Sequence, residues 1–165
     1  MAKEIERKFL VLRDRWQTFV AAAAPEGKAY RQGYIATATL GQSVRVRIAG
    51  TKGFLTIKGP VEGTQSLTRA EFEYDIPVSD AQEILETLCE RPFISKTRYT
   101  ITLDNFVWEV DDFKGENEGL VVAEVELASE EQSFSRPDWL GEEVSGDPKY
   151  YNSSLVKQPY STWSS

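Results

Sequence analysis

The chain has 165 residues, a formal net charge of −7 and no histidine. Its length fits one domain, so we expect residues 1–165 to fold as a single unit with a sizeable buried core. The lack of histidine excludes zinc sites with imidazole ligands and every catalytic triad that depends on imidazole, and the negative charge argues against a nucleic acid partner.

A cytoplasmic location is indicated by the cysteine content and by the N-terminus. Cys89 can form no internal disulfide, and charged residues fill the N-terminus, where a secretory signal requires an apolar stretch. The longest apolar run, 19–24, is far shorter than the roughly 20 residues of a membrane span. We therefore expect a soluble protein with no membrane partner, and the sequence leaves open whether it forms a homodimer.

The first half of the chain predicts one short helix among strands. Alternating polarity predicts a strand over 3–11, and Asp14 is suited to cap a helix over 15–24 that packs on the outside of a sheet. Further alternating segments, bounded by turns rich in glycine and proline, predict antiparallel strands at 30–37, 43–49, 53–58 and 69–76.

The second half adds three strands and the best-defined helix. A capping-box pattern at 79–82 opens a helix whose apolar residues recur at helical spacing until Pro92. Strands are expected at 93–103, 106–112 and 120–127, which brings the total to eight. A second capping-box pattern at 129–132 predicts a short helix, and a last helical turn is expected near 154–156.

Charged residues recur two positions apart within the strands, which places each pair on one face, and each pair shares one sign. An ordinary solvated face would mix signs, because like charges opposite each other across strands are destabilising by up to about 1 kcal/mol. The acidic pairs are Glu4 with Glu6, Glu71 with Glu73, Glu109 with Asp111 and Glu124 with Glu126, and the basic pairs are Arg45 with Arg47 and Lys96 with Arg98.

These charged faces predict a closed barrel with a wet interior. The fold class we expect is mainly β (α+β): a closed eight-stranded antiparallel barrel with a few short helices outside and at the C-terminus. Burying so many ions in a dry core would cost several kcal/mol per ion, so the interior must hold water or a charged ligand. Carboxylates without imidazole or thiolate favour magnesium, manganese or calcium, and arginine and lysine favour phosphate oxygens.

The order of these motifs, from Glu4-x-Glu6-x-Lys8 to Glu124-x-Glu126, resembles the CYTH superfamily, the triphosphate tunnel metalloenzymes. The resemblance covers nearly the whole chain, from residue 1 to about 156. It implies an eight-stranded antiparallel tunnel and the hydrolysis or cyclisation of triphosphate compounds with Mg²⁺ or Mn²⁺.

The resemblance also implies residue roles. It implies metal-facing carboxylates at Glu4, Glu6, Glu124 and Glu126, with Glu71, Glu73 and Asp111 as further ligands or as acceptors behind them. It implies substrate-binding cations at Lys8, Arg45, Arg47, Lys58, Lys96, Arg98 and Lys149. Of these, Glu4, Glu6, Lys8 and Lys149 are our candidate catalytic residues, and Lys149 would reach back toward the tunnel from a closing helix.

Some assignments have a simpler alternative. Glu73, Asp75, Glu109 and Lys96 could be surface or ion-pairing residues, whereas Arg31 and Arg69 could join the cations, although the turns beside them leave their facing open.

The function we expect is hydrolysis of a short linear triphosphate, most of all inorganic tripolyphosphate to pyrophosphate and phosphate. The alternatives are a class IV adenylyl cyclase, which needs a pocket for base and ribose, and a non-catalytic module that binds polyphosphate or phosphorylated metabolites. A carrier of apolar ligands would need an apolar interior, which the charged faces exclude. No sequence feature marks a nucleoside pocket, and the acidic pairs favour an enzyme over a binding module.

Overall fold

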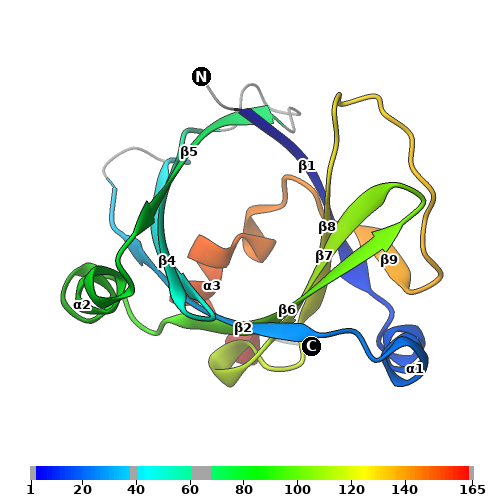
Figure 1. Cartoon of the computed structure of the whole chain (residues 1–165), viewed down its shortest axis with the longest axis horizontal. Helices are drawn as coiled ribbons and strands as arrows, with labels where there is room; N and C mark the ends of the chain where they lie inside the picture. Colours follow the sequence, from blue (N-terminus) through cyan, green and yellow to red (C-terminus); the bar gives the residue numbers. More distant parts are fainter. Residues whose placement is uncertain (1–2, 38–40, 61–67, 164–165) are drawn as a thin grey trace.

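The computed structural model describes residues 3–37, 41–60 and 68–163. Eight antiparallel strands close into a barrel, because β5 pairs with β1 as well as with β4 (Figure 1). Around the barrel the order is β1, β5, β4, β3, β2, β6, β7, β8 and back to β1. The strands are β1 (Lys3–Val11), β2 (Gly27–Ile35), β3 (Ser43–Ala49), β4 (Lys52–Lys58), β5 (Thr68–Ile76), β6 (Ile94–Leu103), β7 (Phe106–Phe113) and β8 (Val121–Glu126).

The predicted barrel is confirmed, and so is the placing of its apolar faces on the outside. On β1, Glu4, Glu6 and Lys8 point inward, while Phe9 and Val11 are buried against the outer layer. The main hydrophobic core therefore lies between the barrel wall and the segments that cover it. Its largest members are Phe9, Trp16, Trp108 and Trp139, whose rings pack edge to face.

Two helices cover the outside of the barrel. Helix α1 (Arg13–Ala23) buries Trp16 in the main core, and α2 (Val78–Leu88) buries Ala81 and Leu85 against β3 and β4 (Figure 1). Both predicted N-caps are wrong, because α1 begins after Leu12 and α2 after Pro77, and neither has a side-chain cap. Packing of the apolar faces, rather than capping, therefore fixes where these helices begin.

The segment after β8 differs from the prediction. The expected helix at 129–132 is a turn instead. The Gln132 side-chain oxygen accepts a hydrogen bond from the Ala128 backbone N–H at 2.6 Å. A ninth strand, β9 (Leu140–Glu143), then pairs with the C-terminal part of β1, at Phe9 and Val11. This strand was not predicted. Its four residues are too few to show a clear alternation of polarity.

The C-terminal segment returns to the barrel. Helix α3 (Asn152–Lys157) lies within the ring of strands when the barrel is viewed end on (Figure 1), which confirms the predicted helical turn. Leu155 and Val156 hold it by packing, fully or almost fully buried, beside Ile94, Phe113 and Val122. Three short 3-10 turns complete the fold at Gly115–Asn117, Pro148–Tyr150 and Tyr160–Thr162. Within the described ranges, every helix is too short or too polar to cross a membrane.

Two leucines of α2 test how much its packing contributes. Leu85 is fully buried and Leu88 is 61% exposed. We expect Leu85→Ala to lower the free energy of unfolding by about 2–5 kcal/mol, because it removes buried methyl groups and leaves a cavity. Leu88→Ala should stay within about 0.5 kcal/mol of the wild type. Urea unfolding followed by circular dichroism measures both, and equal losses would contradict this packing.

Candidate active site

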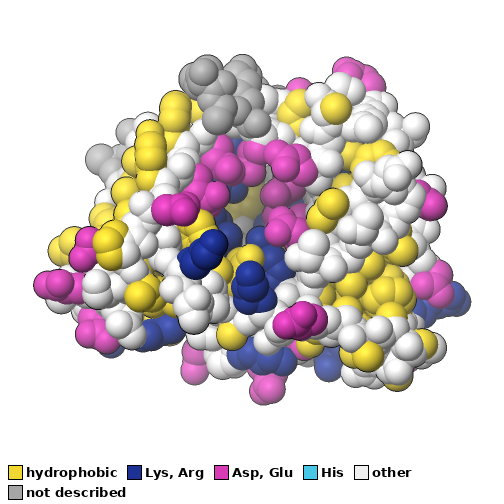
Figure 2. All heavy atoms as spheres, viewed as in Figure 1, with side chains coloured by type: hydrophobic (Ala, Val, Ile, Leu, Met, Phe, Trp, Pro, Cys, Tyr) yellow, Lys and Arg dark blue, Asp and Glu magenta, His cyan; other side chains and the backbone are white. Residues whose placement is uncertain are grey.

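The interior of the barrel is a cavity of about 470 Å³. Figure 2 shows its opening, with acidic side chains gathered along one part of the rim and basic ones opposite. Nine of the predicted site residues line the cavity: Glu4, Glu6, Lys8, Arg45, Arg47, Lys58, Lys96, Arg98 and Glu124. The charged faces of strands far apart in the sequence thus meet in one space.

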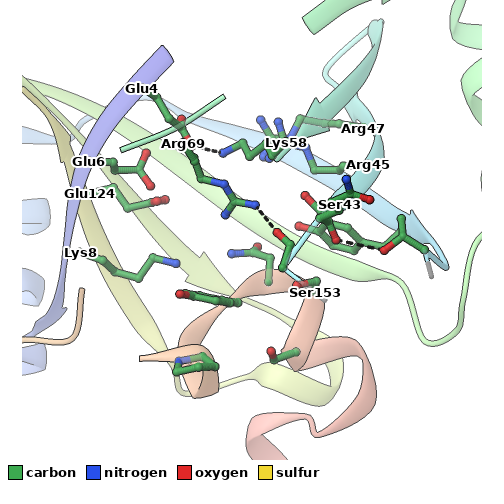
Figure 3. Close-up of a pocket in the computed structure, with 18 of the residues that line it drawn as sticks. Glu4, Glu6, Lys8, Ser43, Arg45, Arg47, Lys58, Arg69, Glu124 and Ser153 are labelled. Atoms are coloured by element: carbon green, nitrogen blue, oxygen red, sulfur yellow. Dashed lines mark hydrogen bonds and ion pairs between the residues drawn. The ribbon is translucent and has the colours of Figure 1, made fainter. Parts of the chain in front are cut away.

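The acidic wall is built by β1 and β8. Glu6 and Glu124 come from these neighbouring strands, in which Lys8 pairs with Glu124 and Glu6 with Glu126 (Figure 3). Burial and the nearby Glu124 charge raise the pKa of Glu6 well above its ordinary value. Burial would also raise the pKa of Glu124, but Lys8 and a hydrogen bond from Glu6 hold that pKa well below its ordinary value. The two carboxyl groups therefore share one proton, which limits their repulsion.

A second carboxyl pair lies next to the first. Lys58 Nζ lies 2.6 Å from Glu4 Oε1 and 3.4 Å from Glu71 Oε2. Burial would raise the pKa of Glu4, but hydrogen bonding with Glu71 and the charge of Lys58 lower it. Burial and Glu4 raise the pKa of Glu71 to about 7. Glu4 is thus the ionised member of this pair.

The donor atoms of this wall fit a hard divalent cation. Carboxylate oxygens are the ligands that Mg²⁺ and Mn²⁺ prefer, and a bound cation would relieve the same repulsion that the shared protons now relieve. In the described ranges no three acidic, cysteine or histidine side chains already converge around one point. Glu4 is engaged by Lys58, so these carboxylates would have to exchange partners to bind an ion.

The remaining predicted metal residues lie at the edge of the cavity or behind its wall. Glu73 accepts a hydrogen bond from Thr56 at 2.9 Å and lies 3.6 Å from Arg45 Nη2. Glu126 is largely exposed. Partial burial of its carboxyl, together with the Glu4 charge, raises its pKa. Glu71, Glu73, Asp111 and Glu126 do not line the cavity. A role in metal binding for Glu71, Glu73 and Glu126 stays a prediction.

The basic wall has Arg45 and Arg47 on β3, across the cavity from Glu6 and Glu124 (Figure 3). It meets the acidic wall at Lys58 on β4, which contacts Glu4. Arg47 is 8% exposed, and its guanidinium lies over the Tyr30 ring at 4.7 Å from the centroid. Burial and the charges of Arg45 and Arg98 lower the pKa of Arg47 to about 10. The buried Nε of Arg45 has no hydrogen-bond partner among the residues that the structure describes. An anion in the cavity would stabilise both cations.

Asp111 lies behind the cavity lining, next to two cations of the basic wall. It is fully buried, and its carboxylate accepts hydrogen bonds from Arg98 Nε at 2.7 Å, Arg98 Nη2 at 2.9 Å and Lys96 Nζ at 2.7 Å. Both of its oxygens are therefore occupied by cations of the basic wall. Asp111 is thus the counterion of Lys96 and Arg98, which fits the expected alternative of an acceptor behind the ligands, and its role in metal binding stays a prediction. Despite this counterion, burial lowers the pKa of Lys96 to about 7.

Lys149 does not line the cavity. Its ammonium lies 4.0 Å from the centroid of the Trp163 ring, and its backbone N–H is bonded to Asp147. Its predicted reach toward the tunnel is not seen in this arrangement, and its catalytic role stays a prediction. From the same segment, Lys157 lines the cavity instead.

Arg69 also lines the cavity and was rated only as an alternative from the sequence. Its guanidinium donates to the backbone carbonyls of Gly59 at 3.0 Å and Gly41 at 2.9 Å, and so links two turns (Figure 3). Arg31, the other alternative, is exposed and lies over the Phe93 ring, away from the cavity lining. The sequence also did not single out Tyr34 and Asn152, because neutral polar residues carry no charge pattern.

Removing the buried counterion should be costly. Asp111→Ala leaves Lys96 and Arg98 buried without their main partner, and we expect a loss of about 3–5 kcal/mol in the free energy of unfolding. Asp112→Ala is the control, because in the described ranges the Asp112 carboxylate forms a single ion pair, with Lys114 at the surface, worth up to about 1 kcal/mol. Urea denaturation compares the two variants, and a similar small loss in both would rule out the counterion role.

Comparison with known proteins places this barrel among relatives of known activity. The family profile of the CYTH domain matches residues 2–159. The chain is 52% identical over 160 residues to the inorganic triphosphatase of Acetivibrio thermocellus, with 97% of each chain covered. It is 40% identical over 160 residues to the inorganic triphosphatase of Nitrosomonas europaea, with 93% of this chain and 96% of the relative covered.

Solved structures give the same picture. The crystal structure of an inorganic triphosphatase matches with a TM-score of 0.61 at 36% identity, covering 94% of this chain and 95% of the other. A Pyrococcus horikoshii protein matches with a TM-score of 0.58 at 18% identity, covering 78% and 81%, which supports the fold alone. The family profile and the identity to both relatives lead to one conclusion: this chain belongs to the CYTH domain family.

Proposed function

We propose that this protein is an inorganic triphosphatase that hydrolyses tripolyphosphate to pyrophosphate and phosphate. The observation that carries the proposal is the cavity itself, in which an acidic wall faces a basic wall across a space of about 470 Å³. A linear triphosphate with a divalent cation carries both kinds of charge that these walls complement. The identity of 52% to an inorganic triphosphatase over nearly the whole chain supports the same substrate.

We propose Mg²⁺ or Mn²⁺ as the cofactor, held by Glu4, Glu6 and Glu124 with Glu71, Glu73 and Glu126 near them. When bound there, the cation would supply a Lewis acid that neutralises phosphate oxygens and lowers the pKa of a water molecule. Glu124, whose pKa is well below its ordinary value, is ionised at neutral pH and can accept a hydrogen bond from that water.

The basic wall holds the substrate. Arg45, Arg47 and Lys58 would bind phosphate oxygens, and Lys96 and Arg98 on β6 would add charge to the same wall. As charge builds on the transferred phosphoryl group and on the leaving pyrophosphate, these fixed cations stabilise it. Lys8 stands between the walls and donates a hydrogen bond to the Tyr150 carbonyl at 3.1 Å, so its ammonium is already oriented.

Loss of a wall carboxylate should abolish turnover without unfolding the protein. Glu4→Ala or Glu6→Ala removes a carboxylate that could bind the metal from a wet interior, and it removes no part of the packed core. We expect the circular dichroism spectrum to be retained and phosphate release from tripolyphosphate to stop. Excess chelator should have the same effect on the wild type, and added Mg²⁺ or Mn²⁺ should reverse it. Unchanged activity in chelator would refute the metal-dependent mechanism.

Tripolyphosphate should be a better substrate than ATP. In ATP an ester replaces a terminal phosphate oxygen, so a charge-assisted contact with the basic wall is lost. Such a contact is worth about 1.5–3 kcal/mol, or roughly ten- to over a hundredfold in kcat/KM. Phosphate release from tripolyphosphate, ATP and thiamine triphosphate, measured side by side with each metal, compares them. Cyclic AMP as the main product from ATP would favour the cyclase alternative.

A further inference from the structure

Two neutral carboxamides connect the closing helix to the basic wall. Gln32 on β2 is fully buried, and its Oε1 accepts a hydrogen bond from Arg47 Nε at 2.8 Å. Its Nε2 donates to Tyr34 Oη at 2.9 Å and to Asn152 Oδ1 at 3.2 Å. Asn152 Oδ1 accepts a second hydrogen bond, from Lys96 Nζ at 3.0 Å. One chain of hydrogen bonds thus runs from Arg47 to Lys96 through both amides.

Cations at both ends of this chain determine how each amide is turned. Guanidinium and ammonium groups can only donate hydrogen bonds. Arg47 therefore requires the oxygen of Gln32 on its side, which directs the Gln32 nitrogen toward Asn152. Lys96 independently requires the oxygen of Asn152. Rotation of either amide by 180° would place a donor against a donor, so both orientations are fixed.

Within the described part of the chain, the fixed orientation leaves the Asn152 nitrogen without an acceptor. Asn152 lines the cavity, whereas Gln32 lies behind it. No residue in the described ranges accepts a hydrogen bond from Asn152 Nδ2, although its oxygen is used twice. The nitrogen carries two N–H donors beside the cavity that Arg47 and Lys96 also line.

We propose that Asn152 is a substrate-binding residue whose Nδ2 donates a hydrogen bond to a phosphate oxygen, and that Gln32 is the positioning residue that holds it. This inference rests on the proposed triphosphatase function. It adds an uncharged contact from α3 to a site otherwise built from ions. Burial, and then the charges of Arg98 and Arg47, lower the pKa of Lys96. A neutral donor can approach an anion without adding to that repulsion.

Two variants of Asn152 separate this role from simple anchoring of the helix. Asn152→Ala removes both the donor and the acceptor, while Leu155 and Val156 keep α3 packed. Asn152→Asp keeps the acceptor for Lys96 and Gln32 in the same shape, but has no donor and adds a negative charge. If Asn152 only anchors α3, the alanine should keep the wild-type affinity; if Asn152 binds phosphate, both variants should lose affinity, and the aspartate should lose more because its charge also repels the anion.

The experiment is a calorimetric titration with tripolyphosphate in excess chelator, which needs no turnover. We expect Asn152→Ala to weaken binding roughly ten- to a hundredfold, as for a hydrogen bond to a charged group, and Asn152→Asp to weaken it more. Steady-state kinetics with Mg²⁺ should show the loss mainly in KM, because the contact is present in ground and transition states alike. Gln158→Ala, an exposed amide at the end of α3, is the matched control and should stay within about twofold.

The outcomes distinguish this inference from the proposed function. Wild-type affinity in either Asn152 variant would overturn the role of Asn152 while leaving the triphosphatase intact. A wild-type protein that binds tripolyphosphate but releases no phosphate would overturn the proposed activity, and the same titration would still decide the role of Asn152. A wild type that neither binds tripolyphosphate in chelator nor releases phosphate from it with Mg²⁺ or Mn²⁺ would overturn both. Should Asn152→Ala fail to fold by circular dichroism, the isosteric Asn152→Asp decides.

Discussion

The structure depends on one electrostatic constraint: charge turned into the interior of a closed barrel has to be neutralised there. An ion moved from water into a dry interior loses several kcal/mol of hydration, and its own strand cannot restore this. The barrel meets the constraint by collecting opposite signs on opposite walls and by keeping its packed core outside, around Trp108 and Trp139. Stability and ligand binding therefore occupy different faces of the same strands, and a side chain of the cavity can change without disturbing the core.

Neutralisation is achieved in three ways. Asp111 neutralises part of the charge of the basic wall, since its two oxygens accept three hydrogen bonds from Arg98 and Lys96. The acidic wall instead shares protons, within the pair of Glu6 and Glu124 and within the pair of Glu4 and Glu71. Arg47 has neither solution: it receives one amide oxygen and one aromatic face, and its pKa falls to about 10. Arg47 is thus a buried cation with no carboxylate partner in the described ranges, and an anionic ligand would supply one.

The sequence predicts the wall residues well because a period of two and a shared sign are local properties. Glu4, Glu6, Arg45 and Arg47 could be assigned to one interior from their spacing and from eight strands. The period of two cannot distinguish the roles of Glu109 and Asp111, which share a face of β7. Only the register with β6 shows that Asp111 lies opposite Arg98 on the neighbouring strand. The direction of the Lys149 side chain could not be predicted for another reason. It is set by contact with Trp163, fourteen residues later in a segment without periodicity. The predicted first residues of the helices are wrong because tertiary packing outweighs a cap worth about 1 kcal/mol.

The amides of Gln32 and Asn152 show what charge patterns leave out. A buried carboxamide has four hydrogen-bonding sites, and its orientation is defined only when neighbours of fixed type surround it. Arg47 and Lys96 are such neighbours, so the charged residues that the sequence reveals determine the geometry of the neutral ones that it hides. The same contact joins α3 to the barrel, since Asn152 is its first residue. The end of the cavity and the orientation of its cations are therefore set by one hydrogen-bonded unit, and a ligand that displaces one partner must act on all of them.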